Sequence, residues 1–155
     1  MACAFAECFE WFCSNRSELE SRWLGLRKKF LDSLEDVEQC FVLGTPDESL
    51  PNTLNLGFQG ISAESQLICL DLDGIAVSSG SACSSGAMEA SHVLLAMGYS
   101  HEQAKSSLRI SMGWNTSEED IEELSRQLIH HVKRLTPISG KSDSNIQFPE
   151  PVTEI

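Results

Sequence analysis

The sequence has few basic side chains and no long hydrophobic run. Its 155 residues include 11 lysines and arginines against 23 aspartates and glutamates, which gives a formal charge of −12. Such a chain repels phosphate backbones and anionic lipid, and no local basic patch offsets the charge, so nucleic acid and membranes are excluded as partners. No apolar stretch approaches the ~20 residues of a membrane-spanning helix. We expect one soluble globular domain.

The amino-terminal stretch lacks the features of a secretion signal, although it is apolar. The opening "MACAFAECFEWFC" has no basic leader and carries Glu7 and Glu10 inside the run. We therefore expect a cytoplasmic location, in which the six cysteines are reduced thiols rather than a disulfide framework.

The cysteines also lack the spacing of metal ligands. No C-x-x-C pair occurs, and Cys3, Cys8 and Cys13 recur every five residues, which scatters them around a helix axis. No metal site is predicted. Cys40 and Cys69 lie in the apolar contexts "VEQCFVL" and "LICLDL", which favour packing in the core.

Capping residues and apolar periodicity predict the helices. Their expected starts, with capping partners, are Ser17 with Glu20, Ser62, about Ala90, Ser100 with Gln103, and Thr116 with Glu119. The helix after Ser62 should run through Leu72 and end at Asp73 and Gly74, and the helix from Ala90 should end at Gly98.

Short apolar segments bounded by turn residues predict the strands, which are "VEQCFVLG", "TLNLGF", "GIAVS" and "SLRISM". The turn-forming "TPDESLPN" between the first two suggests an antiparallel pair. The fold class expected is α+β, with a small three- or four-stranded antiparallel or mixed sheet and helices packed on one face. The chain from Thr136 onward has three prolines and scattered apolar residues, and it is interpreted as a flexible tail.

One thiol has unusual neighbours. The stretch "AVSSGSACSSGAMEASHVL", residues 76–94, places Cys83 among serines and glycines, directly ahead of an apolar helical pattern. These neighbours are too small to bury a thiol and too flexible to fix its position. An ordinary structural role for Cys83 is therefore not obvious.

Several segments, in their order and spacing, resemble the carboxy-terminal small domain of the cysteine desulfurases, pyridoxal-phosphate enzymes of the class V aminotransferase type. They are "LPNTLNLGF", "GIAVSSGSACSSG", "EASHVLLAMG", "SSLRISMG" and "TSEEDIEEL". The resemblance covers roughly residues 17–135, which we interpret as a desulfurase-like small domain. Residues 1–16 are then a remnant of an interdomain helix, and residues 136–155 are the flexible tail.

The resemblance implies that Cys83 is the nucleophile that attacks the sulfur of cofactor-bound cysteine, leaving alanine and an enzyme persulfide. Small loop residues suit a segment that collects sulfur beside the cofactor and carries it to an acceptor. A thiol with a pKa of ~8.5 is only slightly ionised at neutral pH, so the site must lower that pKa or supply a base. His92 is close enough in sequence to be a candidate base, but it follows the expected helix start, and a side chain that simply faces solvent or core is the favoured alternative.

Arg109 lies in an alternating, strand-like segment. A fixed guanidinium there could clamp a substrate carboxylate through two parallel hydrogen bonds, or it could pair with one of the many acidic side chains. The family's arginine at this motif position binds the substrate carboxylate, which favours the first interpretation. Asn55 and Ser107 match motif positions too, but turn and strand-edge roles explain them equally well.

The chain also departs from the family. A complete desulfurase has a large domain with a lysine that holds pyridoxal phosphate, an acid that pairs with the pyridine nitrogen, and a histidine stacked on the ring. None is recognisable, because the lysines at 28, 29, 105, 133 and 141 lie in helical or tail contexts. No pyridoxal phosphate is expected on this chain alone. Ala90 stands where the family often has proline, and "GWN" replaces a commonly basic, aromatic pair.

The sequence therefore predicts the persulfide-forming part of a cysteine desulfurase. It would take sulfur from L-cysteine onto Cys83, giving L-alanine, and pass it to an acceptor protein for iron-sulfur cluster or thiolated-RNA synthesis. We expect it to be inactive without a large domain or a full-length desulfurase that carries the cofactor. The alternative is a non-catalytic desulfurase-like domain that acts as a sulfur carrier or as a regulator of a full-length desulfurase.

Overall fold

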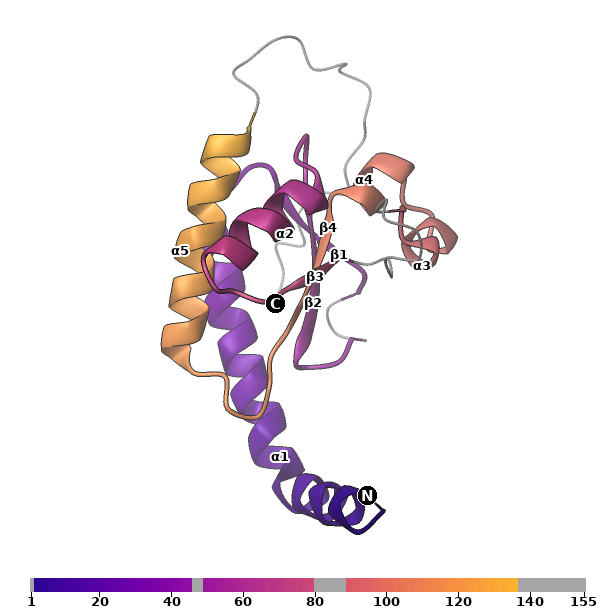
Figure 1. The fold of residues 1–155 in the computed structure, drawn as a ribbon, viewed down its shortest axis with the longest axis vertical. Coiled ribbons are helices and arrows are strands. Elements are labelled where there is room, and N and C mark those ends of the chain that lie inside the picture. Colours follow the sequence, from indigo (N-terminus) through magenta and orange to yellow (C-terminus); the bar gives the residue numbers. More distant parts are fainter. Residues whose placement is uncertain (1, 46–48, 80–88, 137–155) are drawn as a thin grey trace.

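The structure, a computed structural model, describes residues 2–45, 49–79 and 89–136 (Figure 1). Cys83 and the predicted tail after Thr136 lie outside these residues. The elements in chain order are α1 (Ala2–Ser33), β1 (Cys40–Leu43), β2 (Thr53–Phe58), α2 (Ala63–Leu72), β3 (Ser78–Ser79), α3 (His92–Ala96), α4 (His101–Lys105), β4 (Ser107–Ser111) and α5 (Glu118–Leu135).

The strands form a four-stranded sheet in the order β1-β2-β4-β3, and every neighbouring pair is antiparallel. The α+β prediction is therefore confirmed. The order places β1 and β2 next to each other, as the turn between them suggested. None of the helices in the described ranges is both long enough and apolar enough to cross a bilayer.

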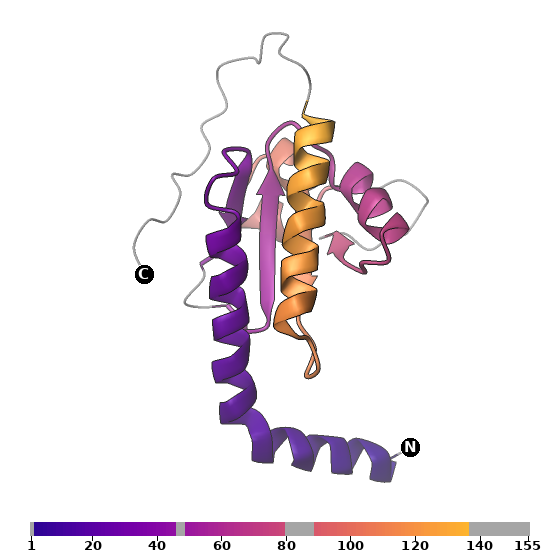
Figure 2. The ribbon, with the colours of Figure 1, turned by 90° about the vertical axis from the view of Figure 1, so that its left-hand side faces the viewer.

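One face of the sheet carries the main core. Leu54, Leu56 and Phe58 alternate along β2, and they pack with buried side chains of α1, α2 and α5. Figure 2 shows α1 and α5 running side by side along this layer. Each fully buried large apolar side chain contributes roughly 1.5–3 kcal/mol through removal from water, so this face supplies most of the stability.

The helix α1 begins at Ala2 rather than at Ser17, so the predicted start at a capping box of Ser17 with Glu20 is wrong. The residues before Ser17 contain no proline or glycine that would stop a helix. Buried side chains of α1 begin at Leu19. The capping pattern therefore coincides with the point where α1 meets the core, and not with the point where the helix begins.

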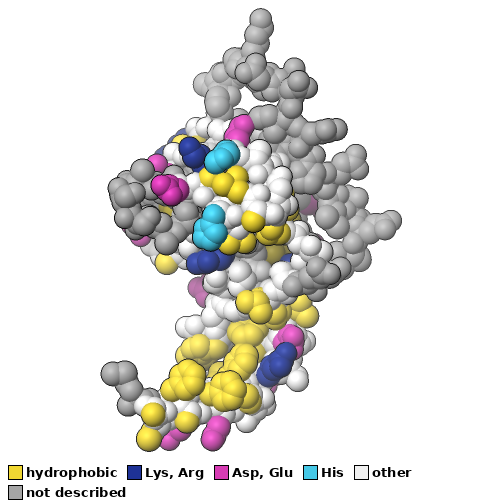
Figure 3. Space-filling model, turned by 90° about the vertical axis from the view of Figure 1, so that its right-hand side faces the viewer, with side chains coloured by type: hydrophobic (Ala, Val, Ile, Leu, Met, Phe, Trp, Pro, Cys, Tyr) yellow, Lys and Arg dark blue, Asp and Glu magenta, His cyan; other side chains and the backbone are white. Residues whose placement is uncertain are grey.

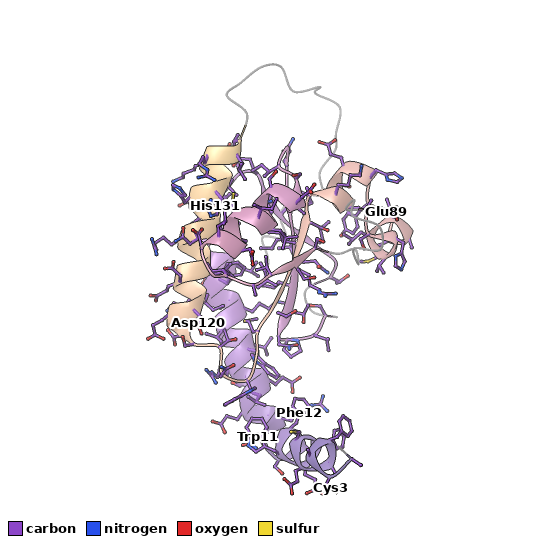
Figure 4. All side chains as sticks on the ribbon, in the orientation of Figure 1. Cys3, Trp11, Phe12, Glu89, Asp120 and His131 are labelled. Atoms are coloured by element: carbon purple, nitrogen blue, oxygen red, sulfur yellow. The ribbon has the colours of Figure 1, made fainter. Side chains whose placement is uncertain are left out.

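The amino-terminal part of α1 turns away from the rest of the helix (Figure 2). We refer to residues 2–13, which precede Ser14, as the first part of α1. Ser14 Oγ donates to the Glu10 carbonyl at 2.9 Å, and Asn15 Nδ2 donates to the Trp11 carbonyl at 2.7 Å. Side chains that bond to carbonyls four residues earlier favour bending of a helix. Figure 3 shows hydrophobic side chains gathered on this part of the molecule, and Figure 4 labels Trp11 and Phe12 there. The exposed aromatic side chains of this part are Phe5, Phe9, Trp11 and Phe12.

The start of α5 differs from the prediction by one residue. Ser117 caps α5 and forms the capping box with Asp120, whereas the sequence suggested Thr116 with Glu119. The hydroxyl of Thr116 instead accepts a hydrogen bond from the Gly113 N–H at 2.8 Å, which closes the preceding turn. The segment "TSEED" contains two overlapping capping patterns, so only the turn at Gly113 decides between them.

The predicted cap of α2 at Ser62 and the capping box of Ser100 with Gln103 are both confirmed. The strand predicted over "GIAVS" is confirmed only at its end, because β3 is limited to Ser78 and Ser79. The N–H of Ile75 donates to the Leu70 carbonyl at 2.8 Å, which ties the residues after α2 to that helix. The helix predicted from Ala90 is shorter, since Ser91 caps α3.

Gln66 of α2 is fully buried, and neither of its amide atoms has a hydrogen-bond partner in the described part of the chain. A buried polar group without a partner costs about 1–3 kcal/mol. We therefore expect Gln66→Leu to raise the free energy of unfolding by about 1–2 kcal/mol in urea denaturation. Gln59→Leu, at an exposed position, is the control and should change little. A lower free energy of unfolding in Gln66→Leu would contradict the interpretation that the Gln66 amide is buried without a hydrogen-bond partner.

Candidate functional site

Arg109 lies in a row of side chains that crosses the sheet. Asn55 of β2 is its partner on one side, and Ser78 of β3 is its partner on the other. Leu43 of β1 is opposite Asn55 and extends the row. Side chains of directly opposite residues share one face of a sheet. The row therefore lies on the face opposite the main core.

The α3–α4 unit covers the apolar part of this face. Leu43 packs against Leu94 and Ala104, and the backbone N–H of Gly44 donates to the Tyr99 hydroxyl at 2.8 Å. The prediction that helices pack on one face is therefore incomplete, because the short helices α3 and α4 cover part of the opposite face. The partly or fully exposed polar side chains on the remainder of the face are Thr53, Asn55, Ser78, Arg109 and Ser111.

The guanidinium of Arg109 is exposed, and its Nη2 donates to the Ser78 hydroxyl at 3.2 Å. Within the described ranges no carboxylate forms an ion pair with Arg109. The alternative that Arg109 serves a structural ion pair therefore finds no support there. A guanidinium with free donors in a polar surface is suited to bind a carboxylate or a phosphate.

Cys83 is connected to this row through β3. Ser79, the second residue of β3, precedes Cys83 by four residues in the sequence, and Cys83 itself lies outside the described residues. Glu89 resumes the described chain after residues 80–88, and Figure 4 shows it beside α3 and α4. The chain thus leaves the sheet next to Arg109 and returns at the α3–α4 unit.

The other candidates have different settings. Ser107 is buried, and its hydroxyl donates to the Ala104 carbonyl at 2.9 Å, which is a structural role. His92 is exposed at the first position of α3. Sequence reasoning missed Ser78 as a contact of Arg109. Its only signal was a polar residue at the end of an apolar segment.

The cysteines differ in their surroundings. Cys40 packs against the main core as predicted, and burial raises the pKa of its thiol to about 12. Cys69 is half-buried beside a cation, because Arg134 Nη2 donates to its Sγ at 3.2 Å. The three cysteines of the first part of α1 are exposed. The described residues contain no cluster of three or more His, Cys, Asp or Glu side chains that could hold a metal ion.

The described lysines do not fit a pyridoxal-phosphate site. Lys29 forms ion pairs at 2.7 Å with Glu118 and with Glu122, and hydrogen bonds to these carboxylates raise its pKa above the usual value. A lysine that forms a Schiff base needs a lowered pKa. Lys28, Lys105 and Lys133 are exposed on helices. None of these described lysines is therefore suited to bind pyridoxal phosphate as a Schiff base.

Residues 1–124 match the family described as Aminotransferase class-V. The chain is 35% identical over 135 residues to Cysteine desulfurase IscS 1 of Archaeoglobus fulgidus, covering 87% of this chain and 35% of that protein. It is 38% identical over 135 residues to Cysteine desulfurase IscS of Acinetobacter baumannii, covering 85% and 33%. A solved structure titled NifS-like protein matches with a TM-score of 0.73 at 26% identity, covering 84% and 32%.

The chain belongs to the class V aminotransferase family. Within that family the relatives reported above are named cysteine desulfurases, and the resemblance inferred from the sequence motifs is confirmed. The chain spans about a third of the length of these relatives.

Proposed function

We propose that this chain is the persulfide-forming part of a cysteine desulfurase. Cys83 is the sulfur acceptor, and Arg109 binds the carboxylate of L-cysteine. In the net reaction the Cys83 thiol and L-cysteine give a Cys83 persulfide and L-alanine. The sulfur atom moves from the β-carbon of cysteine to the Cys83 sulfur, and its place on carbon is taken by a proton. No external oxidant or reductant is required.

The single observation that carries this proposal is the bond between Arg109 and Ser78. It attaches the candidate carboxylate site to the strand that leads into the segment with Cys83. A substrate whose carboxylate is held at Arg109 would have its sulfur a few ångströms from that carboxylate, and the segment with Cys83 follows β3 directly in the sequence.

The chemistry that cleaves the carbon–sulfur bond would be supplied by the pyridoxal phosphate of the complete enzyme. The setting of the described lysines favours a supply of that cofactor from other residues of the family fold, on this polypeptide or on a partner desulfurase. Delivery of the persulfide sulfur to an acceptor protein, for iron-sulfur clusters or thiolated RNA in the cytoplasm, is part of the proposal. If this chain is never joined to the cofactor, the same thiol makes it a sulfur carrier or a regulator.

A chimaera tests the proposed function. This chain replaces the matching third of a cysteine desulfurase, and L-alanine release from L-cysteine is measured. We expect turnover in the chimaera. The separate chain with added pyridoxal phosphate should show neither aldimine absorbance nor alanine. Arg109→Ala in the chimaera should lower kcat/KM about 10–100-fold, because a charged hydrogen-bond pair to the substrate is lost.

Arg126→Ala is the matched control, since Arg126 pairs with Glu123 on the exposed side of α5. It should leave kcat/KM unchanged. A folded, cofactor-loaded chimaera without turnover, or equal losses in both arginine variants, would contradict the proposed function. Stoichiometric cofactor binding with turnover by the separate chain would contradict the external supply of the cofactor.

A further inference from the structure

We propose that Ser78 is a positioning residue, whose hydroxyl holds the guanidinium of Arg109 in the orientation that receives an amino-acid carboxylate. The inference rests on the carboxylate role proposed for Arg109. It adds the residue that determines how the arginine is presented.

The hydroxyl of Ser78 is oriented to accept from Arg109. Its proton is used in a hydrogen bond to the Ser79 carbonyl at 3.0 Å. A hydroxyl has one proton and two lone pairs, so the side facing the guanidinium offers acceptors only. Arg109 Nη2 donates to this oxygen at 3.2 Å. The backbone pairing of Ser78 with Arg109 brings both side chains to the same point of the sheet.

Arg109 needs such support because its long side chain is exposed. An arginine side chain has up to ~2 kcal/mol of rotamer entropy to lose when a ligand fixes it. A bond to Ser78 removes part of this cost before the ligand arrives. It uses one of five N–H donors and leaves others for a two-point contact with a carboxylate. Of the described side chains, no carboxylate competes for these donors.

The neighbouring hydroxyl of Ser111 provides a matched comparison. Ser111 is on the same strand as Arg109, two residues away and exposed, so it lies on the same face. No hydrogen bond joins Ser111 to Arg109 in the described structure, whereas Ser78 has one. A general effect of removing a polar group from this surface would therefore appear in both serine variants, and a specific effect would appear only at Ser78.

The test follows the Nε–Hε signal of Arg109 by NMR in the ¹⁵N-labelled full chain, assigned through its loss in Arg109→Lys. In the parent, the heteronuclear NOE should indicate a more ordered side chain than that of Arg16, whose Nε lies 3.8 Å from Glu20 Oε2 in an exposed ion pair. Ser78→Ala should reduce the Arg109 value to that of Arg16. Ser78→Thr, which keeps the hydroxyl, should restore it, and Ser111→Ala should leave it unchanged.

Titration with L-alanine then measures carboxylate binding, with L-alaninamide as the ligand that lacks the carboxylate. Ser78→Ala should raise the Kd for L-alanine about three- to tenfold. An Arg109 signal and Kd that are the same in Ser78→Ala and the parent would overturn the role of Ser78. If L-alanine and L-alaninamide shift the Arg109 signal of the parent with the same Kd, the carboxylate role of Arg109 is contradicted. This result is independent of the NOE comparison, which tests Ser78.

Discussion

Replacing Phe30 with alanine is expected to lower the free energy of unfolding by about 3–5 kcal/mol. Phe30 is 1% exposed and lies where α1 packs into the main core with side chains of the sheet and α5. Removal of the ring leaves a cavity that close-packed neighbours fill only partly. The free energy of unfolding therefore falls both because less apolar surface is buried and because packing contacts around the cavity are lost. The change is measured by urea denaturation followed by circular dichroism.

Phe9→Ala is the matched control, because Phe9 is on the same helix and 59% exposed. Its ring stacks on Phe5 with the centroids 6.4 Å apart, which is a surface contact. The change in unfolding free energy should stay within about 0.5 kcal/mol. A loss at Phe9 as large as the loss at Phe30 would contradict the assignment of the core to the second part of α1.

Much of the fold could be predicted from local signals. Short apolar segments bounded by turn residues identified β1, β2 and β4, and side-chain capping identified the starts of α2 and α4. These signals act over a few residues, so a single sequence contains them. The start of α1 and the capping residue of α5 were missed for the opposite reason. Each had two locally acceptable solutions, and contacts with distant residues select between them.

The candidate site divides in the same way. The alternating pattern around Arg109 predicted a strand, and the family resemblance gave the guanidinium the role of binding a carboxylate. The contact with Ser78 joins residues 31 positions apart in the chain. Its detection requires the register of β3 against β4, which the sequence does not contain as a local pattern. Cys83 was assigned by resemblance alone, and its assignment stays a prediction.

Cys83→Ala is expected to abolish transferable sulfur. Burial raises the pKa of Cys40 to about 12, so its thiol stays protonated and a poor nucleophile at neutral pH. Cys69 is half-buried beside Arg134. The exposed thiols of the first part of α1 can be alkylated, yet they lie on the part of the helix that turns away from the sheet (Figure 2). The proposed function assigns the sulfur to Cys83, which follows β3 in the sequence.

The central claim is tested most directly by mapping the persulfide after incubation with a competent desulfurase and L-cysteine. The parent, Cys83→Ala and the control Cys13→Ala are alkylated, digested and analysed by mass spectrometry. The account predicts persulfide on the peptide with Cys83 in the parent and in Cys13→Ala, and none that can be transferred in Cys83→Ala. Persulfide at full yield in Cys83→Ala, or spread evenly over Cys3, Cys8 and Cys13, would contradict it.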